Sequence, residues 1–240
     1  MMAIPIINCT GLDDGEDAGE HRSSAYDIAL MSRELLKHDA IRNYTTIWMD
    51  TVRNGQFGLS NTNKLVRFYK GTTGLKTGYT SSAGHCLSAS AQRDGIELIA
   101  VVMHCASSTE RFSSAKQLLD YGFANYALVS PEPEAAPVQI RLGTTDEVIP
   151  APESDEPLLV DKARRAAVRQ ETELLPEIDA PVEAGQQLGQ LRIYAGDEQL
   201  AVIPMVAPEA IDRLSVWEIA KRLLDGVCFG GREQGKAAVT

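Results

Sequence analysis

Residues 74–80 read Gly-Leu-Lys-Thr-Gly-Tyr-Thr, and this stretch decides how the first half of the chain is interpreted. A glycine turn at 71–74 precedes it, so the stretch is expected to enter a strand. On that strand Lys76 would supply a positive charge and Thr77 a hydroxyl donor, both suited to binding a carboxylate. Gly78 leaves the backbone bare, so an extended peptide can add along the strand edge. The stretch therefore predicts a substrate-binding strand, with the backbone N–H of Tyr79 able to face a developing oxyanion.

The elements around this strand are expected to alternate between helix and strand. Ser24-x-x-Asp27 resembles a capping box, and helical periodicity follows it over 25–37. A second helix is expected over 109–125. Strand patterns lie between the helices, at Leu65–Tyr69, Leu75–Thr80, His85–Ala91 and Ile96–Met103, with Asp94-Gly95 as a hairpin turn. The last of these strands is strongly apolar and long enough to be central to a sheet. This order predicts an α+β domain over residues 1–130 with an antiparallel sheet.

The chain changes character at Pro131-Glu-Pro-Glu-Ala-Ala-Pro137, which is typical of a stiff, extended linker over 131–137. Short β-type runs follow it, broken by Gly, Pro and Asp. They are Val138–Leu142, Glu147–Pro150, Leu158–Val160, Ala167–Thr172, Gln187–Tyr194 and Gln199–Val206, with Gly196-Asp197 as a hairpin turn. This spacing predicts a small all-β domain over 138–208.

An amphipathic helix is predicted within residues 209–226, followed by a flexible tail over 227–240. Ser215-x-x-Glu218 is a capping box, and Gly226 is placed to end the helix. Its apolar residues gather on one side: Val216, Trp217, Ile219, Ala220, Leu223 and Leu224. The 216–225 helix has three interpretations, namely contact with a membrane surface, packing on the β domain, and self-association.

Composition excludes several classes of function. The 240 residues carry a net charge of -10, which argues against nucleic acid as a partner. The four cysteines form no CxxC pair and show no metal-ligand spacing with histidine, so we expect no metal site. No apolar run reaches the ~18 residues of a membrane span. The first residues lack a basic segment, so we expect no signal peptide in this chain.

Beyond residues 74–80, the chain resembles a known family in several segments that occur in the same order. They are Asn8-Cys-Thr-Gly-Leu-Asp-Asp14, Ser23-Ser-Ala-Tyr-Asp27, Asn61-Thr-Asn-Lys-Leu65, Gly74-Leu-Lys-Thr-Gly-Tyr-Thr-Ser-Ser-Ala-Gly84 and Ile99-Ala-Val-Val-Met103. The family is that of the low-molecular-mass penicillin-binding proteins, the serine-type D-alanyl-D-alanine carboxypeptidases of peptidase family S11. The resemblance covers residues 8 to about 126 closely and Val182–Val206 more loosely.

The resemblance implies a transpeptidase/β-lactamase-like fold at the extracytoplasmic face of a bacterial membrane. Such enzymes remove the terminal D-alanine of peptidoglycan stem peptides through a serine acyl-enzyme, without metal or cofactor, and β-lactams acylate the same serine. Carried over by position, Lys76, Thr77 and Gly78 match the family's third catalytic motif. Tyr79, Thr80 and Arg111 are the implied substrate-binding residues, Arg111 lying near the substrate carboxylate. The alternative for Arg111 is a solvated residue in the first turn of a helix.

The chain departs from the family pattern in the motifs that should come before Lys-Thr-Gly. It contains no Ser-x-Asn or Tyr-x-Asn, and its one Ser-x-x-Lys, Ser113-Ser-Ala-Lys116, follows Lys-Thr-Gly inside a predicted helix. We therefore expect the C-terminal portion of such an enzyme, lacking a nucleophile and inactive alone. Two alternatives are a non-catalytic module that binds peptidoglycan peptides or serves as a scaffold, and a relative of the serine β-lactamases.

Overall fold

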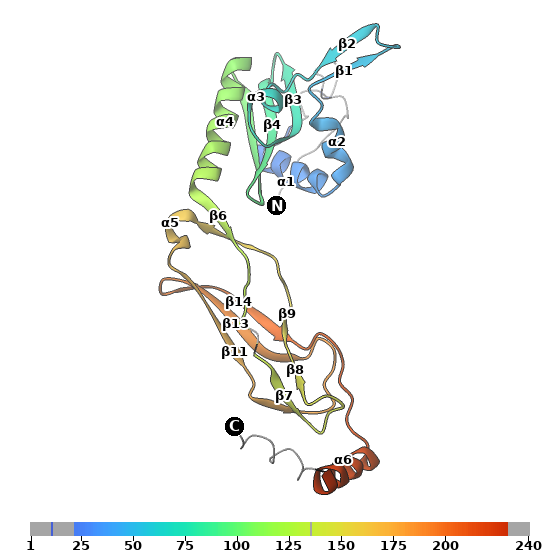
Figure 1. Cartoon of the computed structure of the whole chain (residues 1–240). Coiled ribbons are helices and arrows are strands. Elements are labelled where there is room, and N and C mark those ends of the chain that lie inside the picture. Colours follow the sequence, from blue (N-terminus) through green and yellow to red (C-terminus); the bar gives the residue numbers. More distant parts are fainter. Residues whose placement is uncertain (1–10, 12–21, 135, 230–240) are drawn as a thin grey trace, which may run out of the picture. The chain divides into compact units, whose positions relative to one another are not determined.

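A computed structural model of the chain describes residues 11, 22–134 and 136–229 (Figure 1). The chain divides into two compact units, Met1–Leu128 and Val129–Thr240, which are treated separately below. Apart from Gly11, the family-like segment at 8–14 lies outside the described residues, and so does the predicted tail from 230 onward.

The first unit is an antiparallel sheet with helices, in the α+β class that the sequence predicts. Its elements are α1 (Ala25–Leu36), the short 3-10 helix η2 (Asp39–Ile41), α2 (Arg42–Thr45), β1 (Met49–Val52), β2 (Phe57–Ser60), α3 (Leu65–Phe68), β3 (Thr72–Thr80), β4 (Gly84–Arg93), β5 (Ile96–Cys105) and α4 (Ser108–Asn125). Strand β6 (Tyr126–Val129) includes the point where the chain passes from the first unit to the second. The main sheet has the order β3-β4-β5, and β1 pairs with β2 in a separate hairpin. Both neighbours of β4 run antiparallel to it.

Local signals in the sequence account for several of these boundaries. The Ser24 hydroxyl accepts a hydrogen bond from the Asp27 N–H and begins α1, as its capping box predicts. Ser107 caps α4 in the same way by accepting from the Glu110 N–H. Asp94 and Gly95 both have positive φ, 50° and 81°, which closes the β4–β5 hairpin tightly.

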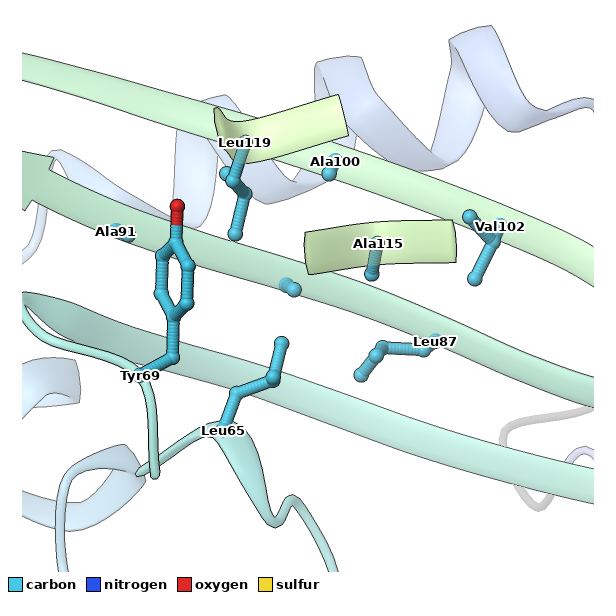
Figure 2. Packing of buried hydrophobic residues seen from close by; sticks show 9 residues of the cluster. Leu65, Tyr69, Leu87, Ala91, Ala100, Val102, Ala115 and Leu119 are labelled. Atoms are coloured by element: carbon cyan, nitrogen blue, oxygen red, sulfur yellow. The ribbon is translucent and has the colours of Figure 1, made fainter. Parts of the chain in front are cut away.

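The core of the first unit lies where α4 and α3 pack on one face of the sheet (Figure 2). Its buried members are Leu65, Tyr69, Leu87, Ala89, Ala91, Ala100, Val102, Ala115 and Leu119. The Tyr69 hydroxyl donates to the Asp120 carboxylate at 2.7 Å, so the buried ring keeps its polar group paired. Burial, followed by this hydrogen bond, raises the pKa of Tyr69 to about 12.

Two sequence predictions for this unit are wrong. Leu65–Tyr69 is not a strand, because residues 65–68 form the helix α3. The Asn63 side chain accepts from the Leu65 N–H at 3.2 Å, and this local bond overrides the apolar β-type pattern. The strand expected at Ile96–Met103 is also not central: among the described strands, β5 lies at the edge and β4 in the middle.

The second unit is mostly β, as the run of short strand patterns predicts. Its strands are β7 (Val138–Arg141), β8 (Glu147–Val148), β9 (Ala151–Pro152), β10 (Leu158–Asp161), β11 (Val168–Leu174), β12 (Glu177–Asp179), β13 (Gln187–Ala195) and β14 (Glu198–Val206). One sheet has the order β11-β13-β14-β9 and another β12-β7-β8, in which β12 and β7 are parallel. Two buried apolar clusters belong to this unit, and α5 (Lys162–Arg165) is a single helical turn.

The terminal helix α6 runs from Val216 to Phe229, later than the predicted 209–226. It continues past Gly226, so the prediction that this glycine ends the helix is wrong. Residues before it are held as extended chain, because Ile211 pairs with Val182 through two backbone hydrogen bonds. The Glu218 carboxylate accepts from the backbone and hydroxyl of Ser215, which completes the expected capping box. These hydrogen bonds lower the pKa of Glu218. Arg222 forms an ion pair with Asp146 at 2.7 Å.

Candidate functional site

The predicted site strand, β3, lies at an edge of its sheet and pairs on one side with β4. In this register Lys76 is opposite Ser88, Gly78 is opposite Cys86, and Tyr79 is opposite His85. Among the described residues no strand pairs with the other side of β3. An edge of this kind presents backbone donors and acceptors to an added peptide strand.

The hydroxyl of Thr77 is held by a residue that the sequence analysis did not single out. Thr77 Oγ1 lies 2.7 Å from Thr62 Oγ1, and Thr77 is buried. The side chain of Lys76 is exposed, and its ammonium group donates to the carbonyl of Thr77. The two polar groups predicted to bind a carboxylate are thus both present at the strand edge.

The loop that carries Thr62 is fixed by the asparagines on either side of it. Asn61 Nδ2 donates to the Ile47 carbonyl at 2.9 Å, and Asn61 Oδ1 accepts from the Asn63 N–H at 2.9 Å. Asn63 is 1% exposed and donates through Nδ2 to the Gly74 carbonyl on β3 at 3.1 Å. The spacing of two asparagines around a threonine, at 61–63, is the sequence signal that could have found Thr62.

The two glycines of the motif are used differently. A Cβ on Gly74 would lie 2.9 Å from the Cβ of Thr45, whose hydroxyl donates to the neighbouring Thr73 carbonyl, so this glycine permits a close approach. A Cβ on Gly78 would meet only Cys86 Cβ, at an ordinary 3.9 Å. Within the described chain, packing therefore does not demand a glycine at 78.

Tyr79 and Thr80 end the strand in different surroundings. The Tyr79 side chain is 62% exposed, and its ring lies 4.4 Å, centroid to centroid, from the imidazole of His85. Thr80 Oγ1 accepts from the Ala83 N–H at 2.9 Å and so helps to close the turn into β4. The substrate-binding roles assigned to both residues stay predictions.

Arg111 is buried, with 8% of its surface exposed, so its alternative interpretation as a solvated helix residue is wrong. Its Nη1 donates to the carbonyls of Gly78 at 3.0 Å and Cys86 at 3.3 Å. The guanidinium group also lies over the Phe112 ring, 4.9 Å from its centroid. Arg111 therefore reaches the site strand, although it contacts backbone carbonyls there and its role toward a substrate carboxylate stays a prediction.

The sheet behind Lys76 is polar on the side of α1. Ser88, opposite Lys76 in the register, shares a buried hydrogen bond of 2.7 Å with Ser32 of α1. Further along, Thr73 Oγ1 lies 2.9 Å from Glu97 Oε1, and Glu97 pairs with Arg42 at 2.7 Å. These two sets of contacts join α1 and α2 to the sheet that carries the predicted site.

Ser113 and Lys116 lie on the exposed side of α4. The Ser113 hydroxyl donates to the Glu110 carbonyl of its own helix at 2.9 Å. The cysteines Cys86 and Cys105 have free thiols, and burial, followed by the nearby Glu110 charge, raises the pKa of Cys105. Within the described ranges no three His, Cys, Asp or Glu residues gather as metal ligands would.

Comparison with known proteins agrees with this description. Residues 3–107 match the peptidase S11 family, described as D-alanyl-D-alanine carboxypeptidase, and residues 123–213 match the family described as penicillin-binding protein 5, C-terminal domain. The D-alanyl-D-alanine carboxypeptidase DacF of Bacillus subtilis is 34% identical over 211 residues, which cover 85% of this chain and 54% of that protein. The chain thus spans about half the length of the curated relatives it matches.

Solved structures show the same likeness in fold. Penicillin binding protein 5 from Haemophilus influenzae matches with a TM-score of 0.64 and 24% identity, over 81% of this chain and 58% of that one. Penicillin binding protein 6B from Escherichia coli matches with a TM-score of 0.57 and 28% identity, over 77% of this chain and 50% of that one. The two family matches and the identity to DacF place the chain in the family of the D-alanyl-D-alanine carboxypeptidases, the low-molecular-mass penicillin-binding proteins.

Proposed function

We propose that the whole protein is a serine-type carboxypeptidase that removes the terminal D-alanine of peptidoglycan stem peptides. The reaction would pass through a serine acyl-enzyme, and β-lactams would acylate the same serine. The observation that carries the proposal is the edge of β3 that no described strand pairs with, where Lys76, Thr77 and Gly78 stand in a chain that belongs to this family. The same family match favours a carboxypeptidase over a β-lactamase.

In this proposal each motif residue has a role that its surroundings suit. The Lys76 ammonium and the Thr77 hydroxyl bind the C-terminal carboxylate of the peptide. When Thr62 donates to Thr77, the proton of Thr77 is left free to point at that carboxylate. The peptide lies along the edge of β3 as an added strand, and the Tyr79 N–H donates to the oxyanion.

We propose further that these 240 residues bind the peptide without reacting with it. The sequence holds no Ser-x-Asn or Tyr-x-Asn, and the hydroxyl of Ser113, in its one Ser-x-x-Lys, donates to its own helix. A nucleophilic serine needs an adjacent base and an oxyanion site in reach. Lys76 and the Tyr79 amide therefore act here as one side of a binding site. Because binding without reaction needs no nucleophile, a non-catalytic binding module is the second candidate function.

Labelling with a fluorescent penicillin tests whether this chain carries a reactive serine or only binds the peptide. The purified 240-residue chain is expected to give no labelled band, and Ser113→Ala is expected to behave identically. A labelled band that disappears in Ser113→Ala would assign the nucleophile to that serine and overturn the proposal. A longer form of the protein that contains Ser-x-x-Lys and Ser-x-Asn but takes no label would favour the non-catalytic module.

We also propose that the first domain spans 1–130, the linker 131–137 and the β-rich domain 138–208.

The helix α6 is proposed to contact the membrane surface at the extracytoplasmic face. Val216 is 85% exposed, Trp217 80% and Leu224 63%, which offers an apolar face to lipid. Among the described helices none is long and apolar enough to cross a membrane. Co-sedimentation with phosphatidylglycerol vesicles is the test: binding should fall at least several-fold in Trp217→Ser, and equal binding would contradict the contact.

A further inference from the structure

Arg111 brings a buried positive charge to the backbone of the site strand. It lies in the first turn of α4 and is 8% exposed, and one of its nitrogens, Nη1, donates to the carbonyls of both Gly78 and Cys86. Among the ion pairs of the described residues, none includes Arg111. Its charge is therefore directed at the backbone of β3 and β4 at the position of Gly78.

The double contact fixes which way the Gly78 carbonyl points. Gly78 and Cys86 are directly opposite each other in the antiparallel ladder. Such opposed residues either exchange both of their hydrogen bonds across the ladder or direct their carbonyls away from each other. One nitrogen lies 3.0 Å from the first oxygen and 3.3 Å from the second, so both carbonyls point between the strands.

The orientation of the Tyr79 N–H follows from the peptide plane. The Gly78–Tyr79 bond is trans, because the cis bonds of the described chain are at Gly74-Leu75 and Ala180-Pro181. In a trans peptide the N–H points opposite to the carbonyl of the same plane. With the Gly78 carbonyl directed at β4, the Tyr79 N–H is directed at the open edge of β3.

We propose that Arg111 is a positioning residue for the Tyr79 amide, holding its peptide plane so that the N–H faces the ligand edge. A cation on the carbonyl also polarises the amide and strengthens its N–H as a donor. This inference rests on the proposed function, since it assumes that the edge of β3 receives the ligand. It differs from direct contact between Arg111 and the substrate carboxylate, because the effect reaches the ligand through the backbone.

The test uses the ¹⁵N-labelled 240-residue chain with Arg111→Met, the conservative Arg111→Lys, and Arg93→Met as a matched control. Arg93 also lies over aromatic rings, those of Tyr69 and Phe123, and donates to a backbone carbonyl, that of Lys70. Without ligand, Arg111→Met should shift the Tyr79 amide resonance and speed hydrogen exchange of the Gly78 and Cys86 amides about tenfold or more. Arg111→Lys should give a smaller change and Arg93→Met none at these amides.

Two ligands then separate the positioning role from direct binding. N-acetyl-D-alanyl-D-alanine and its C-terminal carboxamide are titrated against each variant. A positioning role predicts that Arg111→Met weakens both ligands by a similar factor, whereas direct contact predicts that it weakens the acid alone. An unchanged Tyr79 amide in both Arg111 variants overturns the inference. If the unmodified chain binds neither ligand, the proposed docking at β3 fails. The amide resonances and exchange rates measured without ligand still decide whether Arg111 sets the peptide plane.

Discussion

The hydroxyl oxygens of Thr62 and Thr77 lie 2.7 Å apart, which links the loop before α3 to strand β3. The loop itself is anchored by Asn63, whose amide donates to the carbonyl of Gly74. Thr62 therefore holds the hydroxyl of Thr77, a residue that the family resemblance matches to the third catalytic motif.

Replacing Thr62 by valine removes this hydrogen bond at nearly constant shape. We expect Thr62→Val to lower the free energy of unfolding by about 1 kcal/mol, because a partly buried hydrogen bond contributes about that much. Thr62→Ser should retain most of it. Urea unfolding of Thr62→Val, Thr77→Val and the double variant measures the coupling. Additive effects of the two single changes would show that the hydroxyls do not interact.

The glycines of the motif provide a second, paired prediction. Gly78→Ala should change the free energy of unfolding by less than about 0.5 kcal/mol, because its Cβ would make only an ordinary contact. Gly74→Ala should destabilise by about 1–3 kcal/mol, because its Cβ would overlap Thr45. Gly78→Ala should nevertheless weaken binding of N-acetyl-D-alanyl-D-alanine along β3. Unchanged binding in this stable variant would contradict docking at the strand edge.

The burial of Tyr69, together with its hydrogen bond to Asp120, predicts a dependence of stability on alkaline pH. The pKa of Tyr69 is raised from 10.0 to about 12 in the folded chain, so its contribution is complete below pH 10. Between about pH 10 and 12 the unfolded chain has lost a proton that the folded chain retains. The free energy of unfolding should therefore fall by up to about 1.4 kcal/mol per pH unit in that window. Tyr69→Phe should lose this slope, and equal slopes between pH 9 and 11.5 would refute the assignment.

The capping box of α6 predicts local effects at the end of the chain. The Ser215 hydroxyl and backbone hold the pKa of Glu218 below its usual value. Ser215→Ala should raise the pKa of Glu218 toward that value and reduce the helicity of residues 216–229. The cap should also weaken as the pH falls through the lowered pKa of Glu218, where this carboxylate takes up a proton and stops accepting the Ser215 hydrogen bonds. Carbon-detected NMR titration of Glu218 compares the unmodified chain with Ser215→Ala. A pKa of Glu218 that is unchanged by the substitution would contradict the cap.

Much of the fold could be predicted because its signals are local. Capping residues mark α1 and α4, the Asp94-Gly95 turn marks a hairpin, and the alternating runs after 137 mark the strands of the second unit. The signal failed at Leu65–Phe68, where an apolar run reads as a strand but the Asn63 side chain starts a helix. Periodicity cannot separate these outcomes in so short a segment.

The site was predicted only in part, for a related reason. A motif names Lys76, Thr77 and Gly78, but it says nothing of the residues that hold them. Thr62 acts across 15 positions of sequence and Arg111 across 33, so their contacts depend on the tertiary fold. The burial of Arg111 and its preference for backbone carbonyls are likewise properties of packing.

The measurement that tests the central claim most directly is one NMR experiment on the ¹⁵N-labelled 240-residue chain with N-acetyl-D-alanyl-D-alanine. Amide resonances of Lys76 through Thr80 should shift with ligand concentration, and the ligand should stay intact over days, with no free D-alanine. Absence of shifts along β3 would contradict the docking strand. Release of D-alanine would contradict the absence of a nucleophile.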